Sequence, residues 1–539
     1  MKRQRSTVLI LVLFVGLMAV MTWPQAAHLS DRAVVHQDIY FNMWRLEWFA
    51  HALATHPGAL LDGNIFYPEH RTLTLSDAMF VEGAVAAPLI WARLPPLLVH
   101  NIVLYGAIVA SALGMFMLVR HLTASRGAAV LAAVIFAFAP YRFEHIMHLE
   151  LQWTVWMPWA FWALHRTLET GRLRFGVLTG AMVALQMLSS IYYGIFLATL
   201  LSLVAGLLLI RDRAVPFMRA ALPLAAGAAL ALTVCGLYAQ PYLRTRDAIG
   251  ERSADQIAMF SARPSSYLVA TPTNWLYGRM FQSRGRLERR LFPGAIAVLL
   301  AMIGLLLDRP SDRRIAYLLA LVLAFETSLG FSGYAYRFFY DHVAPYRGLR
   351  ALSRLGIFVV LFLGVLAGYG YAALSRSLRQ PGRRVLFGVL FVGILAEYHV
   401  TLDVAGVYAN TAPALYRFLA RQPRGVVAEF PAPRPYGLPG EDPRYTYLST
   451  FHWFPLVNGY SGVYPPSYLQ RLERLKGFPD ERSLRQLHAD TVRYVIVHSP
   501  PYEPVALARV LSGILDSNEL AQLGSFSDGE GTAYLFVLK

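Results

Sequence analysis

The chain has 539 residues, of which 56% are hydrophobic and 15% are charged. Soluble domains carry roughly 25% charged residues, so this composition excludes an ordinary soluble protein and indicates an integral membrane protein. The formal net charge of +16 is compatible with nucleic-acid binding. However, the arginines cluster in short loops between apolar runs, which is the pattern of membrane topology and anionic-lipid contact. We therefore expect membrane lipids, and no nucleic acid, as partners.

The first apolar run, Val8 to Met21, follows a basic amino-terminal stretch. It fits either an uncleaved first membrane helix or a cleavable signal peptide with a weak cleavage site at Gln25-Ala26-Ala27. Many further apolar runs follow, which favours the uncleaved helix. The single cysteine, Cys235, excludes an intrachain disulfide.

A long polar and aromatic segment, residues 23–100, follows the first helix, and we expect two short juxtamembrane helices in it, around 38–54 and 78–92. In the first of these helices, Asp38, Asn42 and Arg45 fall at helical spacing, and Trp44 and Trp48 are four residues apart. This pattern predicts a helix along the membrane surface with its aromatic side chains toward the headgroups. An interfacial helix with ordinary solvated charges explains the same pattern.

Short arginine-rich loops are expected in the cytoplasm, and an even number of spans must separate consecutive loops of this kind. These loops lie at about 120–126, 166–174, 211–219, 309–314 and 376–384. The rule predicts about eleven transmembrane helices in the inner (plasma) membrane, with the amino terminus cytoplasmic and the carboxyl terminus periplasmic or extracellular. The spans are at about 8–21, 101–119, 127–140, 152–165, two within 175–210 joined by a turn at 189–194, 219–240, 291–308, 315–331, 355–375 and 385–402.

The odd number of spans gathers the remaining loops on one outer face. These loops are residues 23–100, 141–150, 241–290 and 331–354, together with everything after about residue 402. They contain most of the acids, histidines and clustered tyrosines outside the basic loops. A site formed by them would face the cell exterior or the periplasm.

The composition changes after Leu402. Short β-rich runs at 426–430, 494–498 and 533–538 alternate with predicted helices at 413–421, 480–489 and 504–516. We expect an extracytoplasmic α/β domain over residues 403–539, a common domain size, following a transmembrane module over residues 1–402. The fold class is thus a polytopic α-helical membrane protein with a carboxyl-terminal soluble α/β domain.

Several familiar chemical motifs are absent: a glycine-rich phosphate loop, paired cysteines and a His-Glu-x-x-His sequence. Residues of metal-ligand type do cluster in the loop 141–150, but such a cluster is more often a hydrogen-bonded polar patch, so we assign no metal site. Its members are Glu144, His145, His148 and Glu150.

Two arginines, Arg350 and Arg354, precede the apolar run 355–375 at a spacing of four residues. On a helix they would share one face at the membrane boundary, where arginine is costly unless it meets an anion such as a lipid phosphate. Snorkelling to ordinary headgroups explains their position equally well.

Five segments together resemble a known family. They are His36-Gln37-Asp38 followed by Asn42 and Trp44, Asp62-Gly63-Asn64-Ile65-Phe66-Tyr67-Pro68, Phe138-Ala139-Pro140-Tyr141-Arg142, Ser189-Ser190-Ile191-Tyr192-Tyr193-Gly194, and Asn458-Gly459-Tyr460-Ser461-Gly462. The chain resembles the C-type (GT-C) glycosyltransferase superfamily, closest to a large bacterial group of polytopic membrane proteins with Arg350 to Arg354 and such a terminal domain. The resemblance covers nearly the whole chain.

The resemblance implies an inverting glycosyltransferase of the cell envelope. It would move a hexose or pentose from a polyprenyl-phosphate donor to a hydroxyl of a glycan, lipid or protein acceptor on the outer face. Relatives often carry two adjacent acids in the first loop, whereas Gln37-Asp38 supplies one, so a divalent metal stays open and no cofactor is firmly implied. The implied roles are a catalytic base for Asp38, donor-phosphate binding for Arg350, Arg354, Arg347 and Arg142, and acceptor binding or support of Asp38 for His36, Asn42, Glu144, His145, His148 and Glu150.

Two other interpretations remain. A transporter or flippase of envelope lipids would need ionisable residues deep within several spans and a sign of repeated halves. Glu326 and Glu397 are the main acids within predicted spans, and the other polar residues gather at one face, which favours an interfacial enzyme. A catalytically silent scaffold with the same fold is the third alternative. Trp453 and the tyrosines of the terminal domain would stack on sugar rings in an enzyme, although core packing also explains them.

Overall fold

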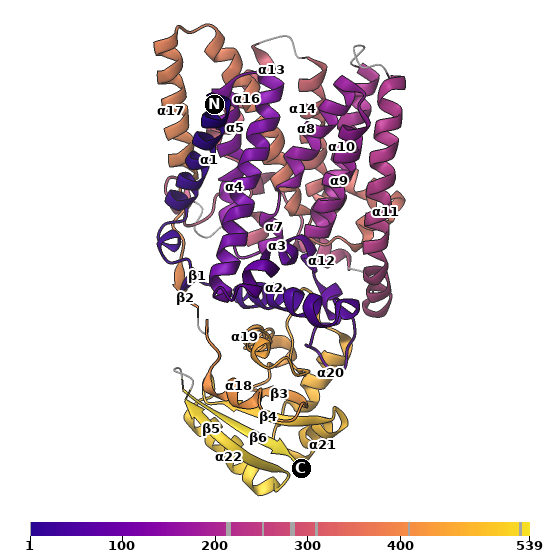
Figure 1. Ribbon diagram of the computed structural model, residues 1–539, viewed down its shortest axis with the longest axis vertical. Helices are drawn as coiled ribbons and strands as arrows, with labels where there is room; N and C mark the ends of the chain where they lie inside the picture. The colour runs from indigo at the N-terminus through magenta and orange to yellow at the C-terminus, as the bar shows by residue number, and fades with distance from the viewer. Residues whose placement is uncertain are drawn as a thin grey trace. The chain divides into compact units, whose positions relative to one another are not determined.

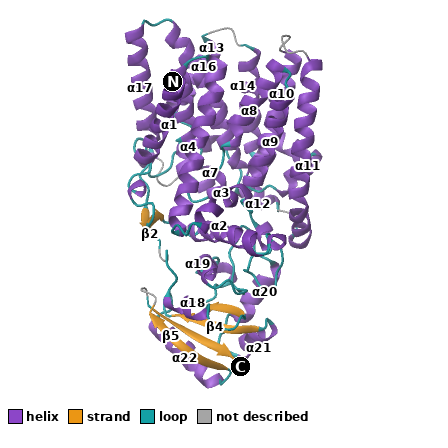
Figure 2. Ribbon diagram, in the orientation of Figure 1, coloured by secondary structure: helices purple, strands orange, loops and turns teal. Residues whose placement is uncertain are grey.

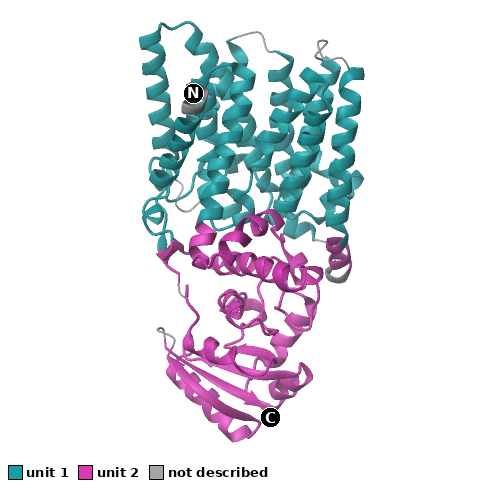
Figure 3. Cartoon of the chain, viewed as in Figure 1, with its two compact units in different colours: residues 1–29, 102–240, 250–404 teal, residues 30–101, 241–249, 405–539 magenta. Residues whose placement is uncertain are grey.

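A computed structural model of the protein describes residues 2–211, 217–250, 253–280, 286–307, 311–407, 410–527 and 531–539. The predicted basic loops at 211–219 and 309–314 lie partly outside these residues. The chain forms two compact units, coloured separately in Figure 3. Unit 1 comprises residues 1–29, 102–240 and 250–404, and unit 2 comprises residues 30–101, 241–249 and 405–539. The predicted boundary after residue 402 differs from this division, since it assigns the first outer loop to the transmembrane module.

The first unit is a bundle of helices that run side by side (Figures 1 and 2). Every predicted span contains a helix, and the predicted turn in 175–210 falls at Ser190, between two of them. The helices are α1 (Lys2–Met21), α4 (Pro96–Thr123), α5 (Arg126–Ala137), α8 (Trp156–Thr170), α9 (Leu173–Ser189), α10 (Ile191–Arg211), α11 (Phe217–Ile249), α13 (Ala295–Leu306), α14 (Asp312–Ser328), α16 (Gly356–Arg376) and α17 (Gln380–Tyr398).

Five helical segments of the described chain are long and apolar enough to cross a membrane: 96–123, 126–144, 191–211, 217–247 and 352–376. The total of eleven spans stays a prediction. Four shorter helices lie in the connections of unit 1, namely α6 (Pro140–Glu144), α7 (Leu149–Gln152), α12 (Ala254–Met259) and α15 (Ala335–His342).

Helices α13 and α16 approach each other unusually closely. A Cβ atom on Gly370 would lie 1.9 Å from the carbonyl oxygen of Leu300, and one on Gly304 would lie 2.3 Å from that of Leu366. Only glycine allows this contact, in the way that small residues bring membrane helices together.

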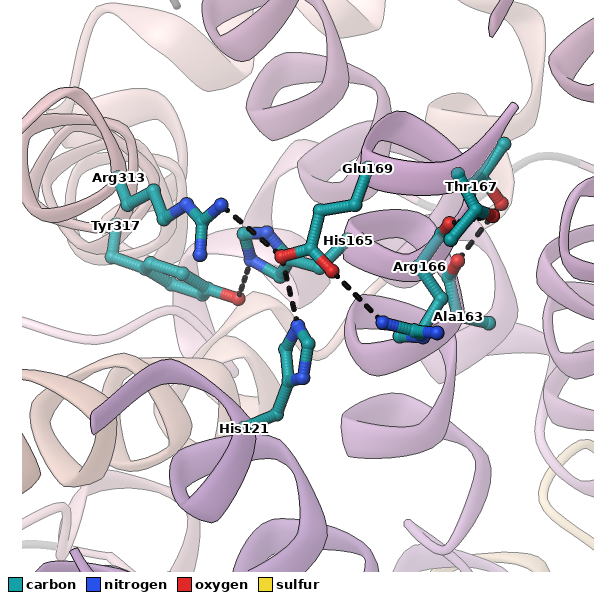
Figure 4. Close-up of polar contacts among 9 residues, drawn as sticks. His121, Ala163, His165, Arg166, Thr167, Glu169, Arg313 and Tyr317 are labelled. Atoms are coloured by element: carbon teal, nitrogen blue, oxygen red, sulfur yellow. Dashed lines mark hydrogen bonds and ion pairs between the residues drawn. The ribbon is translucent and has the colours of Figure 1, made fainter. Parts of the chain in front are cut away.

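A polar cluster joins three helices of unit 1 (Figure 4). The Glu169 carboxylate at the end of α8 accepts hydrogen bonds from Arg166 at 3.2 Å and from Arg313 of α14 at 3.1 Å. His121 Nε2 of α4 lies 3.0 Å from the same carboxylate. These residues belong to three of the loops that the sequence places on the cytoplasmic side. Their contact shows that the three loops meet at one end of the bundle.

The second unit contains a four-stranded sheet with the order β3-β4-β6-β5. Its strands are β3 (Val426–Phe430), β4 (Val492–His498), β5 (Leu520–Ser527) and β6 (Thr532–Leu538). Strand β3 pairs with β4 in parallel, and β6 is antiparallel to both β4 and β5. Two short strands, β1 (Arg32–Val34) and β2 (Val404–Gly406), lie outside this sheet. The three strands predicted after residue 402 are therefore present as β3, β4 and β6.

Seven helices accompany the sheet: α2 (Asp38–Thr55), α3 (Phe80–Trp91), α18 (Ala414–Leu419), α19 (Asp442–Leu448), α20 (Pro466–Leu475), α21 (Glu481–Ala489) and α22 (Pro504–Ser517). The two juxtamembrane helices and the three terminal helices predicted from the sequence correspond to α2, α3, α18, α21 and α22. Helices α19 and α20 and strand β5 are additions to the predicted elements.

Strands β3, β4 and β6 are buried on both faces of the sheet, and alternate residues along them belong to two different apolar clusters. Val427, Tyr494 and Ile496 pack with Trp44 of α2 and with residues of the first loop. Val426, Ala428, Val495 and Val497 pack with residues of α21 and α22. The first loop and the terminal segment thus share one core, which is why they form a single unit.

The prediction that Trp44 and Trp48 face lipid headgroups is wrong. Trp44 is fully buried and Trp48 is 9% exposed, both within this shared core. Their indole N–H groups donate to Asn64 at 3.1 Å and to the Leu60 carbonyl at 2.9 Å. The first loop folds over the helix and supplies the polar partners that headgroups would otherwise provide.

Unit 2 also has a buried polar core at the sheet. The Glu429 carboxylate on β3 accepts a hydrogen bond from Tyr416 at 2.6 Å and lies 2.7 Å from Nε2 of His498. Asp442, at the start of α19, accepts hydrogen bonds from Asn458 at 3.0 Å and from Tyr468. Burial raises the pKa of the Asp442 carboxyl from 3.8 to about 7, against the opposing effect of these two hydrogen bonds.

This shift predicts a pH-dependent stability. The folded chain keeps a proton on Asp442 that the unfolded chain loses above pH 4, so stability falls as the pH rises from about 4 to about 7. The free energy of unfolding should fall by about 2 kcal/mol between pH 5.5 and 8. It falls by about 1.4 kcal/mol for each pH unit up to about pH 7. Asp442→Asn should remove this loss, since asparagine cannot release a proton in this range.

The measurement is thermal unfolding of the purified full chain in detergent at the two pH values, followed by tryptophan fluorescence. Glu441→Gln, which changes the adjacent acid, serves as the control. The assignment fails if Asp442→Asn has the same pH dependence as the wild type.

Candidate functional site

The predicted base, Asp38, is the first residue of α2 and is 8% exposed. A carboxylate at a helix amino terminus is stabilised by the unpaired N–H groups of the first turn. Tyr460, from the terminal segment of the same unit, donates a hydrogen bond from its hydroxyl to Asp38 Oδ1 at 2.5 Å. His36 Nδ1 accepts a hydrogen bond from the Asp38 main-chain N–H at 3.2 Å and lies 3.7 Å from Oδ2.

Asn42 lies one turn further along α2 and is fully buried. Its side-chain oxygen accepts a hydrogen bond from Arg45, and its nitrogen lies 3.5 Å from Nε2 of His100. Arg45 also donates to the Asp77 carbonyl at 2.9 Å and lies over the ring of Phe41. These contacts fit the predicted supporting role of Asn42.

A second group of polar residues lies in unit 1 and centres on Glu288. Its carboxylate accepts hydrogen bonds from Arg354 at 3.3 Å and from the hydroxyl of Ser353 at 3.2 Å, and His145 Nε2 lies 3.9 Å away. Glu288, His145 and Arg354 come from three loops that the sequence places on the outer face. Their contact shows that these loops meet within unit 1.

The electrostatics of this group follow from burial and pairing. Burial alone would raise the pKa of the Glu288 carboxyl, but Arg354, together with smaller effects of His145, His148 and the Ser353 hydrogen bond, outweighs it, and the pKa falls to about 2. Burial lowers the pKa of His145 to about 3. At neutral pH the group therefore contains an ionised carboxylate, a guanidinium and a neutral imidazole.

The other acids of the loop 141–150 are also buried. Glu144 forms an ion pair with Arg290 at 2.5 Å, and Glu150 is 7% exposed. The rings of His145 and His148 are 5.9 Å apart. No three histidine, cysteine, aspartate or glutamate side chains of the described chain are placed to hold a metal ion. The arrangement of the four predicted residues does not fit a metal centre.

Arg350 and Arg354 do not share a helical face, so that prediction is wrong. Helix α16 begins only at Gly356, and Arg354 lies in a 3₁₀ turn, Leu352–Leu355. The main-chain groups here bond to other segments: the Arg350 N–H donates to Tyr192 at 3.1 Å and the Ser353 N–H donates to the Phe260 carbonyl at 3.3 Å. These contacts replace the hydrogen bonds of a continuing helix.

The four predicted phosphate-binding arginines have different surroundings. Arg354 is paired with Glu288 and lies over the ring of Tyr192, whereas the half-buried Arg350 lies over Phe260 and pairs with no acid of the described chain. Arg347 is exposed and donates to the carbonyls of residues 340 and 341. Arg142 is 1% exposed, and its guanidinium donates to the Phe136 carbonyl, Gln152 and Thr154. These contacts favour a structural role for Arg142 and leave Arg350 as the cation best suited to a phosphate.

Trp453 is one of the aromatic residues considered for sugar stacking. One face of its ring is stacked on His51, with ring centroids 4.2 Å apart, and its edge contacts Trp48. Any sugar contact would therefore use the remaining surface of this half-buried ring.

Two residues with buried ionic contacts in unit 1 were not predicted from the sequence. They are Glu288 and Arg290, the partner of Glu144. The available signal is a lone acid in the basic run Arg286 to Arg290, directly before an apolar span. The partner of Asp38, Tyr460, stands in a motif of the family resemblance, but 422 residues separate it from Asp38.

Comparisons with known proteins bear on the fold. No protein-family model matches the chain, and no curated protein does so either. Among solved structures, arabinofuranosyltransferase AftD from Mycobacteria matches with a TM-score of 0.66 and 15% identity, over 99% of this chain and 40% of that chain. A mutant of AftD matches with a TM-score of 0.65 and 15% identity, over 99% of this chain and 41% of that one.

The chain shares the fold of AftD over nearly its whole length. It spans less than half the length of AftD. The archaeal oligosaccharyltransferase AglB from Archaeoglobus fulgidus also matches, over 99% of this chain and 74% of that chain, with 11% identity. Its TM-score of 0.48 is too low to establish a common fold. The AftD match confirms, at the level of the fold, the resemblance to membrane glycosyltransferases that the sequence motifs predicted, and the number of spans and the separate terminal domain stay predictions.

The Glu288–Arg354 pair should be needed for the stability of unit 1. Both side chains are nearly buried, with exposed fractions of 10% and 12%. Glu288→Gln would leave the guanidinium buried without its anion, which costs about 3 kcal/mol. Thermal unfolding of the full chain in detergent, at neutral pH, measures the loss.

A second substitution makes the test specific. Adding Arg354→Met to Glu288→Gln should restore part of the lost stability, because it removes the unpaired charge. Glu481→Gln breaks an exposed pair with Arg485 and should change stability little. A double variant less stable than Glu288→Gln alone would show that the pair is not the source of the loss.

Proposed function

We propose that the chain is a membrane glycosyltransferase that moves a sugar from a polyprenyl-phosphate donor to an acceptor hydroxyl with inversion at the anomeric carbon. The observation that carries this proposal is the fold shared with an arabinofuranosyltransferase over nearly the whole chain. Its sugar, either a pentose or a hexose, and its acceptor, either a glycan, a lipid or a protein, follow from the family resemblance alone.

The proposed mechanism is a single displacement. The Asp38 carboxylate accepts the proton of the acceptor hydroxyl as the hydroxyl oxygen attacks the anomeric carbon. The bond from that carbon to the phosphate oxygen breaks, and the lipid phosphate leaves with the electron pair. A fixed cation stabilises the negative charge that develops on the leaving phosphate, and Arg350 is the proposed contact. Glu144, His145, His148 and Glu150 support the arrangement of the outer loops of unit 1, to which Arg350 belongs.

The environment of the two acids within predicted spans argues against a transporter. Glu397 accepts hydrogen bonds from the N–H groups of Ala295 and Ile296, at 2.7 and 3.2 Å, at the start of α13. Glu326 accepts them from the N–H groups of Tyr334 and Ala335 at the start of α15. Each acid thus stabilises a helix terminus, which is a structural role. An ion or substrate pathway would instead line a cavity with such groups.

The direct experiment is an assay of the full chain in lipid nanodiscs with a panel of polyprenyl-phosphate pentoses and hexoses and with extracted envelope glycans. Transfer of label from one donor to an acceptor would support the proposal. Movement of an intact lipid-linked sugar between leaflets, with no transfer, would favour the flippase alternative. Binding of donors without transfer or movement would favour a catalytically silent scaffold.

The strongest test of mechanism is Asp38→Asn. Asparagine preserves size but cannot take a proton at neutral pH. General-base catalysis contributes about 10²–10⁴-fold, so turnover should fall by that factor while donor binding changes little. Glu47→Gln, on the same helix, is the control and should cost far less. Near-normal turnover of Asp38→Asn would refute the role of Asp38 as base.

A second test concerns the donor phosphate. Arg350→Ala should lower kcat/KM for the donor by about 10- to 100-fold, the effect of losing a charge-assisted hydrogen bond of about 1.5–3 kcal/mol. Lysine should restore it only in part, because it cannot present two parallel N–H groups to phosphate. Arg379→Ala, in a predicted cytoplasmic loop, is the control. Equal donor kinetics for Arg350→Ala and the wild type would leave Arg350 as a lipid anchor.

A further inference from the structure

The loop Asn458–Tyr464 of the terminal segment is held in place by contacts within unit 2. The Asn458 side chain donates to the Glu429 carbonyl and to Asp442, each at 3.0 Å, and its oxygen accepts a hydrogen bond from the Glu429 N–H at 2.8 Å. Its own carbonyl accepts a hydrogen bond from the Phe66 N–H at 3.0 Å. The loop is thereby attached both to the sheet and to the first loop.

Gly459 allows this attachment. A Cβ atom at this position would lie 2.6 Å from a ring carbon of Phe66, so a larger residue would push the loop away. Phe66 is fully buried and cannot yield easily. The close packing at Gly459 sets the position of the next residue, Tyr460.

Tyr460 is in turn aligned by aromatic contacts. Its ring meets Phe41 of α2 edge-on, with centroids 5.1 Å apart, and Phe41 lies one turn after Asp38 on that helix. Tyr464 packs against Tyr460, and Tyr468 stacks on Tyr464. This row of tyrosines ends at the buried Asp442, to which Tyr468 donates a hydrogen bond. The hydroxyl of Tyr460 thus reaches Asp38 from a rigid support.

We propose that Tyr460 is a positioning residue that orients and ionises the Asp38 carboxylate. The inference rests on the proposed function, since it assumes that Asp38 acts as the base. A hydroxyl that donates to one carboxylate oxygen fixes the rotation of the group about its Cβ–Cγ bond. It also favours the anionic form, which is the form that accepts a proton. The terminal segment therefore supplies a component of the site, in addition to its own fold.

Other groups also act on Asp38 and Tyr460. His36 lies 3.7 Å from Oδ2, which is beyond hydrogen-bond distance. The charge of Arg45 also acts on Tyr460, and the charge of Asp38 acts on Tyr464. Tyr464 makes no hydrogen bond from its hydroxyl within the part of the chain that the structure describes, so Tyr464→Phe is a matched control. Tyr460→Phe removes one hydroxyl and keeps the ring contact with Phe41.

The experiment measures the ionisation of Asp38 without any substrate. A water-soluble carbodiimide with a glycine ester modifies carboxyl groups in their protonated form, and mass spectrometry of the α2 peptide follows the modification of Asp38 as a function of pH. Asp38→Asn in the full chain identifies the signal. The proposal predicts that Tyr460→Phe raises the midpoint pH by about one unit, the effect of losing a hydrogen bond to a charged group. Tyr464→Phe should leave the midpoint unchanged.

The kinetic counterpart uses the donor identified by the transfer assay. Tyr460→Phe should move the acidic limb of the kcat profile to higher pH by the same amount, with KM for the donor little changed. A merely structural role would lower folded yield and leave both midpoints in place.

The outcomes separate the inference from the function on which it rests. Equal midpoints in Tyr460→Phe and the wild type, or an equal shift in Tyr464→Phe, would overturn the positioning role while Asp38→Asn still lowers turnover. An Asp38 that stays unmodified in both the wild type and Tyr460→Phe, even at a pH low enough for exposed carboxyl groups to react fully, would refute its role as an accessible base, and the positioning role with it.

Discussion

A carboxylate removed from water requires a cation or a set of hydrogen-bond donors, and this requirement determines how the loops of unit 1 are joined. Glu288 meets Arg354, and Glu144 meets Arg290, so each pair connects loops that are far apart in sequence. At the end of the bundle that contains Glu169, one carboxylate gathers three helices in the same way. Apolar packing brings the helices together, and these ion pairs join particular loops to one another.

The acids of unit 2 show how the surroundings of a carboxyl decide what it can do. Asp442 is enclosed by the sheet and two helices, where burial favours its protonated form. Asp38 stands at the start of α2, where unpaired N–H groups and the Tyr460 hydroxyl favour the anion. Hydrogen-bond donors thus favour at Asp38 the anionic form that a base needs, whereas burial opposes that form at Asp442. The same loop, Asn458–Tyr464, contacts both acids.

Much of this fold could be predicted from periodicity and charge. Apolar runs of about 20 residues located the helices of unit 1, and β-branched runs located β3, β4 and β6, because these patterns are local. Strand β5 was missed, since Leu520 to Ser527 is half polar and lies at the edge of the sheet. The surroundings of Asp38 depend on a residue more than 400 positions away, and those of Arg354 on a residue more than 60 positions away. No local pattern can place Glu288 beside Arg354 or Tyr460 beside Asp38.

Contacts between distant segments also explain why the predicted domain boundary after residue 402 differs from the division into two units. Composition changes after Leu402, which suggests a terminal domain that is complete in itself. In the structure, one face of its sheet is covered by Phe41, Trp44 and Trp48 of α2 and by the first loop. A terminal segment cut at residue 403 would expose Val427, Tyr494 and Ile496 to water, which an independent domain avoids. Because the two segments complete one core, the helix that carries Asp38 and the loop that carries Tyr460 are held in register by the folding of the unit.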